Sequence, residues 1–213
     1  FKALVEGVRD NMYVIPEYQR KFRWKKSQVE ELAASLIRGL PIPPIYAYRN
    51  ERGQMEILDG QQRVMSLYFY YIGKFFKNDK ESVFDYQEID VESAGNFVAA
   101  LEKKYEIVPT DFYMNIDKER CDISYSRLPI ELKRKVDYLV ITIVEIKISN
   151  QDKKDECLHK IFTNLNNGGE QLSPQELRNG IYPCAFNRAM KKVNESNERW
   201  RALWGAADDK STD

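Results

Sequence analysis

The sequence lacks residues on which several classes of enzyme depend. His159 is the only histidine among 213 residues, and a single histidine excludes HExxH zinc sites and His-Asn-His nuclease centres. No Gly-x-Ser-x-Gly motif accompanies it, so a Ser-His-Asp triad has little support. The cysteines are odd in number and widely spaced, at positions 121, 157 and 184. This pattern favours free thiols in a reducing cytoplasm over a zinc site or disulfides.

The chain also lacks long apolar runs and an excess of charge of either sign. No hydrophobic stretch approaches the roughly 20 residues that span a bilayer, and no signal-peptide pattern is present, so we expect no membrane association. Lysine and arginine number 33, as do aspartate and glutamate, which argues against a polybasic protein but allows a local basic patch. Because the chain begins at Phe1 rather than Met and ends in a polar stretch, we expect it to be part of a longer protein.

Hydrophobic residues make up 43% of the sequence, enough for one large domain with a sizeable core. Ser27 and Glu30 form a capping box that predicts the start of a helix, and Gly39 is placed to end it. A short extended piece precedes Pro16. The elements that follow Gly39 are two short strands joined by a hairpin turn and then a longer helix, at 45–48, 55–58 and 61–76.

Residues 78–128 give less clear signals than the first part of the chain. We interpret 78–128 as a variable insertion of short elements and surface loops, and the β-branched run 139–146 as a central strand. Helices are predicted at 130–137, at 154–165 and after a second capping box at Ser173, Pro174 and Glu176. The fold class is therefore α+β, a small mixed sheet flanked by helices with a helical C-terminal part. We place one domain at 1–194 and a polar tail or linker at 195–213.

The segment Ile57–Arg63 carries the clearest pattern for ligand binding. A strand ends, Gly60 makes a turn and a helix begins, which leaves the first helical N–H groups unpaired for an anion. Arg63 offers a forked donor suited to phosphate, and Asp59 is a candidate metal ligand. Gln61 and Gln62 add neutral donors. The alternative is a purely structural helix start in which Asp59 accepts hydrogen bonds as the cap.

A second segment mixes cations with aromatic residues, and a third joins two predicted helices. Cations at 20, 21, 23, 25 and 26 alternate with aromatic residues at 18, 22 and 24, a mixture typical of nucleic-acid contacts. The nucleic-acid-binding candidates are Arg20, Lys21, Arg23, Lys25 and Lys26. The alternative is a solvated loop anchored in the core by Trp24. The third segment, 161–179, is interpreted on its own as a helix–loop–helix connector.

Four motifs occur in an order that resembles one known family. They are IPEYQR-x-F-x-W (15–24), G-x-PIPPIY (39–46), ILDGQQR (57–63) and IF-x-x-LN-x-x-G-x-x-L-x-x-x-ELRN (161–179). This set resembles the N-terminal domain of GmrSD-type restriction endonucleases, a family similar to the wider ParB/sulfiredoxin-like superfamily. Sulfiredoxin carries a catalytic cysteine where this chain has Gln61, so sulfiredoxin chemistry is excluded.

The resemblance implies an NTP-binding and NTP-hydrolysing domain of a prokaryotic anti-phage restriction system. It implies Mg²⁺ with the nucleotide, modified DNA as a partner, and a nuclease domain or subunit that this chain does not contain. An oligomer is compatible with it. Where the family usually has Leu-Thr-Thr-Leu after DGQQR, this chain has Val64-Met65-Ser66-Leu67, so only Ser66 keeps a hydroxyl. The nucleotide-binding candidates implied are Gly60, Arg63, Ser66, Tyr18, Gln19 and Arg20, and the catalytic ones are Asp59, Gln61, Gln62 and Arg63.

Three functional hypotheses follow. The first is an NTPase in which the Gly60 turn and Arg63 hold phosphates, Asp59 holds the metal ion, and Gln61 or Gln62 orients the attacking water. The second is a non-catalytic DNA-binding sensor that uses the second segment, residues 20–26, called the cationic segment below. The third is an assembly module for a nuclease subunit, which an Arg63 held by an internal carboxylate would favour.

Overall fold

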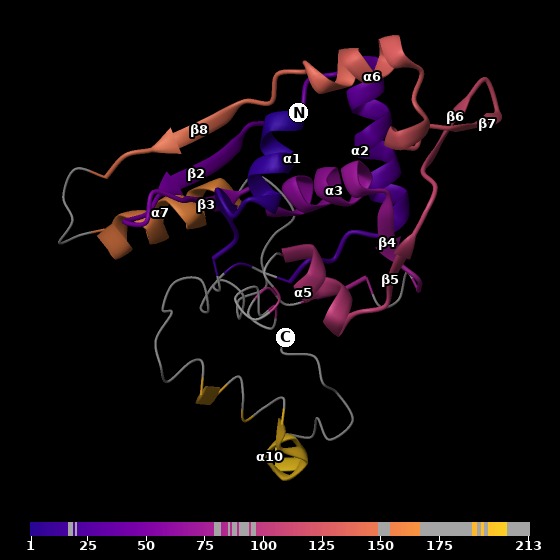
Figure 1. Cartoon of the computed structure of the whole chain (residues 1–213). Coiled ribbons are helices and arrows are strands. Elements are labelled where there is room, and N and C mark those ends of the chain that lie inside the picture. The colour runs from indigo at the N-terminus through magenta and orange to yellow at the C-terminus, as the bar shows by residue number, and fades with distance from the viewer. Residues whose placement is uncertain are drawn as a thin grey trace. The chain divides into compact units, whose positions relative to one another are not determined.

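The chain forms a mixed α+β structure, as the sequence predicts. In the computed structural model (Figure 1) it divides into two compact units, one of Phe1–Glu17 with Lys21–Lys147 and the other of Tyr18–Arg20 with Ile148–Asp213. The residues that the structure describes are 1–16, 19, 21–78, 82–84, 86, 89, 94, 97–148, 154–166, 189–190, 193 and 196–203. Within them, no helix combines the length and apolar character needed to cross a membrane.

The central feature of the first unit is a four-stranded mixed sheet with the order β1-β3-β2-β8. The hairpin predicted from the sequence is present, because β2 (Ile45–Arg49) pairs antiparallel with β3 (Met55–Asp59). The short strand β1 (Tyr13–Val14) runs parallel to β3, and β8 (Ile143–Ile146) runs parallel to β2. The small mixed sheet flanked by helices is therefore confirmed.

The strand predicted to be central lies at an end of this sheet instead. The β-branched run 139–146 contributes only β8, which pairs with β2 alone among the described strands. Val140 is 88% exposed and Val144 is 37% exposed. A run of β-branched residues predicts strand propensity, but it does not distinguish a strand buried on both faces from one with an open face.

Two helices of the first unit lie close to their predicted positions, and one of them packs on α3 (Gln61–Ile72). The helix α2 (Lys26–Arg38) packs on α3, and Gly39 ends it in a left-handed conformation, as predicted. Its start differs from the prediction, because the Lys25 N–H donates to Gln28 Oε1 at 2.9 Å and Ser27 is not the capping residue. The helix α6 (Ile130–Asp137) has the predicted bounds.

The remaining helices fall in both units. The N-terminal helix α1 (Lys2–Arg9), which the sequence patterns did not reveal, also packs on α3. The helix α5 (Phe97–Lys104) completes the helices of the first unit with described bounds. The second unit contains α7 (Lys154–Asn166), close to the predicted 154–165, and α10 (Glu198–Leu203). The predicted capping box at 173–176 and most of the motif at 161–179 lie outside the described residues.

The helix α3 is shorter than predicted. Gly73 adopts a left-handed conformation with φ 67° and ends the helix after Ile72, where the apolar pattern suggested continuation to Phe76. Lys74–Phe76 forms β4, which pairs antiparallel with β5 (Ile107–Pro109). A glycine that accepts a positive φ without steric cost therefore overrides a periodicity that fits both a helix and a strand.

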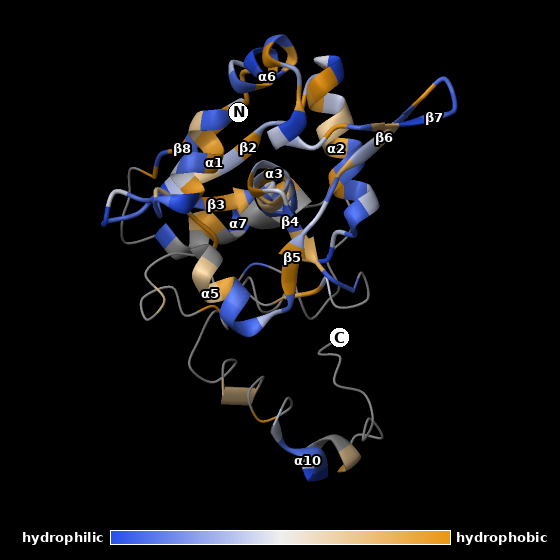
Figure 2. Ribbon diagram, turned by 45° about the vertical axis from the view of Figure 1, so that its right-hand side comes forward, coloured by the Kyte–Doolittle hydropathy of each residue, from blue (hydrophilic) through white to orange (hydrophobic). Residues whose placement is uncertain are grey.

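The segment 105–128, expected to be surface loops and short elements, contributes to the core around α3. A hairpin of β6 (Tyr113–Ile116) and β7 (Glu119–Asp122) is followed by the short 3-10 helix η3 (Tyr125–Arg127). Figure 2 shows β3 and β5 as predominantly hydrophobic strands of the first unit. Buried residues of the segment itself are Phe112, Ile123, Tyr125 and Leu128.

The hydroxyl of Tyr70 links this segment to α3. It donates to the main-chain oxygen of Ile123 at 2.7 Å, and the tyrosine is completely buried. Burial raises the pKa of Tyr70 above its usual value. The next residue, Tyr71, donates only a long bond of 3.5 Å to Glu6.

We expect Tyr70→Phe to lower the free energy of unfolding by about 2 kcal/mol, because it leaves a buried carbonyl without its partner. Tyr71→Phe is the matched control and should cost less than about 0.5 kcal/mol. Urea denaturation of both variants measures the difference. Equal losses would show that the Tyr70–Ile123 bond does not secure the segment.

Candidate functional site

The turn between β3 and α3 has the geometry that the sequence predicts. Gly60 has φ 92°, and α3 begins at the next residue with no side-chain hydrogen bond capping its first turn. A Cβ at Gly60 would lie 3.2 Å from both Arg63 Nη2 and Ile45 Cγ1. Only glycine combines this φ with so close an approach, so the turn requires residue 60 to be glycine.

Arg63 holds the turn to the proline-rich segment before β2. Its Nη2 forms an ion pair with Asp59 Oδ2 at 2.7 Å, while Nη1 donates to the carbonyls of Pro43 at 2.6 Å and Pro44 at 3.2 Å. Asp59 is therefore the partner of Arg63 and not the side-chain cap of α3. An arginine held by an internal carboxylate is the arrangement expected of a structural role.

Both members of this ion pair keep unused hydrogen-bonding capacity. The side chain of Arg63 is 15% exposed and that of Asp59 is 29% exposed. Within the described part of the chain, Arg63 Nε–H, one Nη2–H and Asp59 Oδ1 have no hydrogen-bond partner. The guanidinium can therefore donate two further bonds without leaving Asp59, so a structural role does not prevent it from binding a ligand.

Gln62 joins the turn to the cationic segment. Its Nε2 donates to the main-chain oxygen of Lys21 at 2.9 Å, and its Oε1 accepts from the main-chain N–H of Arg23 at 3.0 Å. The side chain is buried, with 5% exposed. Two of the predicted motifs thus meet, and both polar atoms of the Gln62 amide are used in joining them.

Two other residues proposed for catalysis or nucleotide binding are also buried. Gln61 is 4% exposed and Ser66 is completely buried. The Ser66 hydroxyl has no hydrogen-bond partner within the described residues. In this conformation neither side chain offers surface to a ligand, so a direct role for either requires the first turns of α3 to rearrange.

The aromatic residues of the cationic segment act as anchors. Phe22 is fully buried, and its ring centroid lies 5.4 Å from that of Phe69 and 5.3 Å from that of Phe84. Trp24 is partly buried against the same core. Arg23 and Lys25, which alternate with them, are exposed. The alternation that suggested base stacking therefore places the rings inside and two cations outside.

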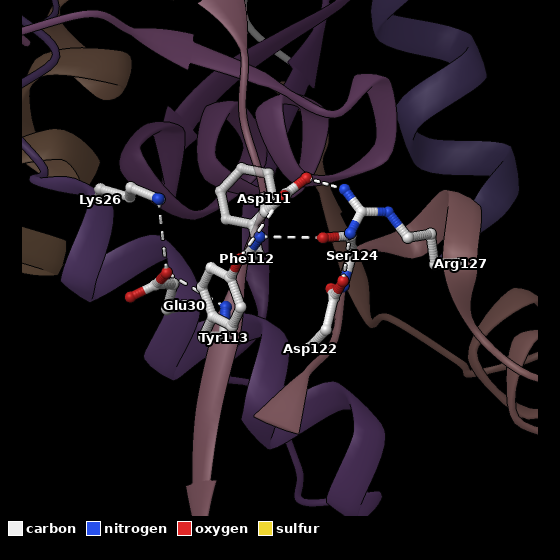
Figure 3. Close-up of polar contacts among 8 residues, drawn as sticks. All are labelled: Lys26, Glu30, Asp111, Phe112, Tyr113, Asp122, Ser124 and Arg127. Carbon is white, nitrogen blue, oxygen red and sulfur yellow. Dashed lines mark hydrogen bonds and ion pairs between the residues drawn. The ribbon is translucent and has the colours of Figure 1, made fainter. Parts of the chain in front are cut away.

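Lys26, the last predicted nucleic-acid contact, belongs to an internal polar network (Figure 3). Its Nζ lies 3.8 Å from Glu30 Oε1 and 5.8 Å from the ring centroid of Tyr113. Glu30 Oε1 also accepts from the Tyr113 N–H at 3.1 Å. The charge of Lys26 is therefore largely satisfied within the protein, in contrast to the exposed positions of Arg23 and Lys25.

The same network fixes the start of η3. The Ser124 N–H donates to Asp122 Oδ1 at 2.8 Å, and Ser124 Oγ accepts from the Phe112 N–H at 3.0 Å. Arg127 forms ion pairs with Asp122 and Asp111 (Figure 3). Hydrogen bonds from Ser124, together with the nearby Arg127 guanidinium, hold the pKa of Asp122 below its ordinary value. These groups attach the β6–β7 hairpin to the core and do not form a ligand site.

The structure brings together only part of the predicted site. Asp59, Gly60 and Arg63 share one turn, and Gln62 connects that turn to Lys21 and Arg23. Tyr18 and Arg20 lie outside the described residues, and Gln19 is buried in the second unit. No group of three potential metal ligands occurs in the described ranges, so Asp59 is a single candidate ligand.

Sequence reasoning missed the carbonyls of Pro43 and Pro44 and the linking role of Gln62. The PIPPIY motif precedes DGQQR in the sequence, and its repeated prolines contributed only to the family resemblance. Proline fixes the backbone and leaves its carbonyl free to accept. The two prolines were therefore the feature of the sequence from which a main-chain partner of Arg63 could have been predicted.

We expect Gly60→Ala to lower the free energy of unfolding by about 2 to 3 kcal/mol, the cost of a strained backbone plus a steric clash. Gly53→Ala is the control, because Gly53 has φ 80° but no atom within 4 Å of its added Cβ. That variant should lose about 1 kcal/mol from backbone strain alone. Equal losses, measured by urea denaturation, would show that the close approach at Gly60 is unimportant.

Comparison with known proteins places the chain in a family. No curated protein and no solved structure matches it, so the expected likeness to ParB and sulfiredoxin stays a prediction. The family model of the GmrSD restriction endonuclease N-terminal domain matches residues 1–183. This range includes the Gly60 turn, the proline-rich segment and the cationic segment. The chain therefore belongs to the GmrSD restriction endonuclease N-terminal domain family and is part of a restriction system.

Proposed function

We propose that this domain binds and hydrolyses a nucleoside triphosphate at the Gly60 turn and regulates a restriction system that acts on DNA. The observation that carries the proposal is the combination at one turn of a helix start without a side-chain cap, a glycine with a left-handed φ, and an arginine with unused donors. The first N–H groups of a helix attract anions. Family membership supports the restriction context.

Arg63 would bind the phosphates through the Nε–H and Nη2–H groups that have no partner in the described part of the chain. Its Nη1 is fixed by the carbonyls of Pro43 and Pro44, so little side-chain entropy would be lost when the ligand binds. Arginine presents two N–H groups in a plane that matches two phosphate oxygens. The ion pair with Asp59 keeps the guanidinium at the turn while it donates to the ligand.

Asp59 is suited to the Mg²⁺ that accompanies a nucleotide. Its Oδ2 accepts from Arg63, while Oδ1 has no partner among the described residues and the side chain is 29% exposed. Protein sites for Mg²⁺ with phosphate commonly use one or two carboxylates, with phosphate oxygens and water completing the coordination. Asp59 therefore fits as the protein ligand. The ion would offset the negative charge of the phosphates.

For hydrolysis we propose that Gln61 orients the attacking water. Gln62 is less suited to this role, because both polar atoms of its amide already bind main-chain groups. Gln61 is the first residue of α3 and lies next to Gly60. Since its side chain is buried, hydrolysis requires the first turn to open when the nucleotide binds. We therefore expect the basal rate of hydrolysis to be slow.

DNA contact by the cationic segment is the second function that a specific observation favours. Arg23 and Lys25 are exposed, and Phe22 and Trp24 fix the backbone between them on the core. Two cations held on one side of an anchored segment are suited to phosphates of a nucleic acid backbone. The zero net charge of the chain means that such binding would be local and sensitive to salt.

Nucleotide binding is tested by thermal denaturation with ATP, GTP, CTP and UTP, each with Mg²⁺. A nucleotide at 100 times its Kd should stabilise the wild type by about 2.7 kcal/mol. Arg63→Ala should abolish this gain. The matched control is Arg49→Ala, because Arg49 also binds one carboxylate, Glu145, and one carbonyl, Gly53, at the opposite end of the hairpin.

A gain that persists in Arg63→Ala would place the nucleotide elsewhere. The absence of a gain with all four nucleotides in the wild type would contradict nucleotide binding altogether. Release of inorganic phosphate by the stabilised complex, measured with Gln61→Ala as the comparison, separates hydrolysis from binding.

DNA binding is tested by the salt dependence of affinity for a DNA duplex. Replacing Arg23 and Lys25 together by glutamine should reduce the log–log salt slope by about 1.8, since each phosphate contact contributes about 0.9. The control with the same change of charge replaces the exposed Arg52 and Lys147 by glutamine. An equal effect of the two double variants would show that only net charge matters, and the cationic segment would not be the contact.

A further inference from the structure

Gln62 binds the cationic segment in the way that a neighbouring strand would. Its amide donates to the Lys21 carbonyl and accepts from the Arg23 N–H, at 2.9 Å and 3.0 Å. These two groups flank Phe22 and point to the same edge of the extended backbone. A glutamine with one donor and one acceptor used on a single segment specifies both the position and the direction of that segment.

The opposite edge of the same segment is also held. The Phe22 N–H donates to the Phe84 carbonyl at 2.9 Å, and the Phe22 carbonyl accepts from the Phe84 N–H at 3.2 Å. The ring of Phe22 packs on Phe69 of α3, the helix that carries Gln62. The segment is therefore attached by one edge to residue 84 and by the other edge to the first turn of α3.

The residues beside Gln62 are those of the proposed nucleotide turn. Gln61 precedes it and Arg63 follows it on the first turn of α3. A rearrangement of this turn on nucleotide binding would change the two hydrogen bonds that Gln62 makes to the cationic segment. Because Gln62 is buried, a bond broken there leaves polar groups without solvent, and the segment would shift to satisfy them.

We propose that Gln62 couples the two sites, so that a nucleotide at the Gly60 turn changes the affinity for the phosphates of DNA of residues 21–25 within the cationic segment. The inference rests on the proposed function. Gln62 is here a positioning residue that touches neither ligand. Coupling between binding sites typically changes affinity about 5- to 150-fold, and the effect is reciprocal.

The test compares the affinity for a short unmodified DNA duplex at low salt with and without saturating nucleotide and Mg²⁺. The nucleotides are ATP, GTP, CTP and UTP in turn, and the readout is the anisotropy of a labelled duplex. In the wild type, the nucleotide that stabilises the fold should change DNA affinity at least about 5-fold. Gln62→Met, which keeps the length of the side chain, should reduce that ratio to within 2-fold of unity, since 2-fold is only about 0.4 kcal/mol.

Gln54→Met is the matched control. The Gln54 amide also uses both polar atoms, with Nε2 donating to the Asn11 carbonyl at 3.0 Å and Oε1 accepting from Asn50 Nδ2 at 3.3 Å. It lies in the hairpin turn, and within the described part of the chain its amide bonds to residues 11 and 50 and not to the cationic segment. This variant should lose stability but keep the wild-type ratio of DNA affinities. Gln62→Glu, which keeps the acceptor for Arg23 and loses the donor to Lys21, is used if Gln62→Met does not fold.

The outcomes separate this inference from the function on which it rests. If the wild type binds a nucleotide and DNA independently, or if Gln62→Met and Gln62→Glu keep the wild-type ratio, the coupling is wrong while the proposed function stands. If no nucleotide stabilises the wild type, nucleotide binding is wrong, and if no DNA binds, DNA contact by the cationic segment is wrong. The coupling fails in either case. Loss of coupling in Gln54→Met as well would assign the effect to general destabilisation.

Discussion

At Gly60 the backbone passes directly from β3 into α3, and the positions of Asp59, Gln62 and Arg63 all depend on this turn. The left-handed φ of 92° brings the helix start against Ile45 on the neighbouring strand. Arg63 then reaches back to Asp59 and across to the carbonyls before β2. The contacts that close the turn leave donors of Arg63 and Oδ1 of Asp59 unused among the described residues, so the same residues serve the fold and the proposed ligand site.

Local signals predicted the fold where they were unambiguous. The hairpin of β2 and β3, the end of α2 at Gly39 and the bounds of α6 follow from turn residues and periodicity that allow one interpretation. The prediction failed at Gly73 and at 139–142, where the same apolar or β-branched pattern fits two structures. At Gly73 the left-handed φ of the glycine ends the helix, and of the run 139–146 only 143–146 pairs with β2. The contribution of 105–128 to the core depends on Tyr70 and Ile123, which are distant in sequence, and no local pattern reveals it.

Part of the candidate site was predictable as a set of residues, but the roles of those residues were not. The types and order of residues 59–63 indicate an anion-binding turn, and the structure places Asp59, Gly60 and Arg63 together. The sequence did not show that Gln62 binds the backbone at 21 and 23, because a glutamine side chain is equally able to bind water, ligand or main chain. Likewise, the alternation of Arg23 and Lys25 with aromatic residues did not show whether the aromatic rings face the core or a nucleic acid. A loop anchored in the core and a nucleic-acid contact have the same alternating pattern.

The bridge between Phe22 and Phe84 can form only after synthesis of the chain has passed residue 84. The cationic segment leaves the ribosome early, but one of its two edges is satisfied only by a residue that is synthesised after the whole of α3. Domains generally fold as units during synthesis. A nascent chain that ends before residue 84 therefore presents Phe22 without its partner, and the segment reaches its final position only after the core around α3 has closed.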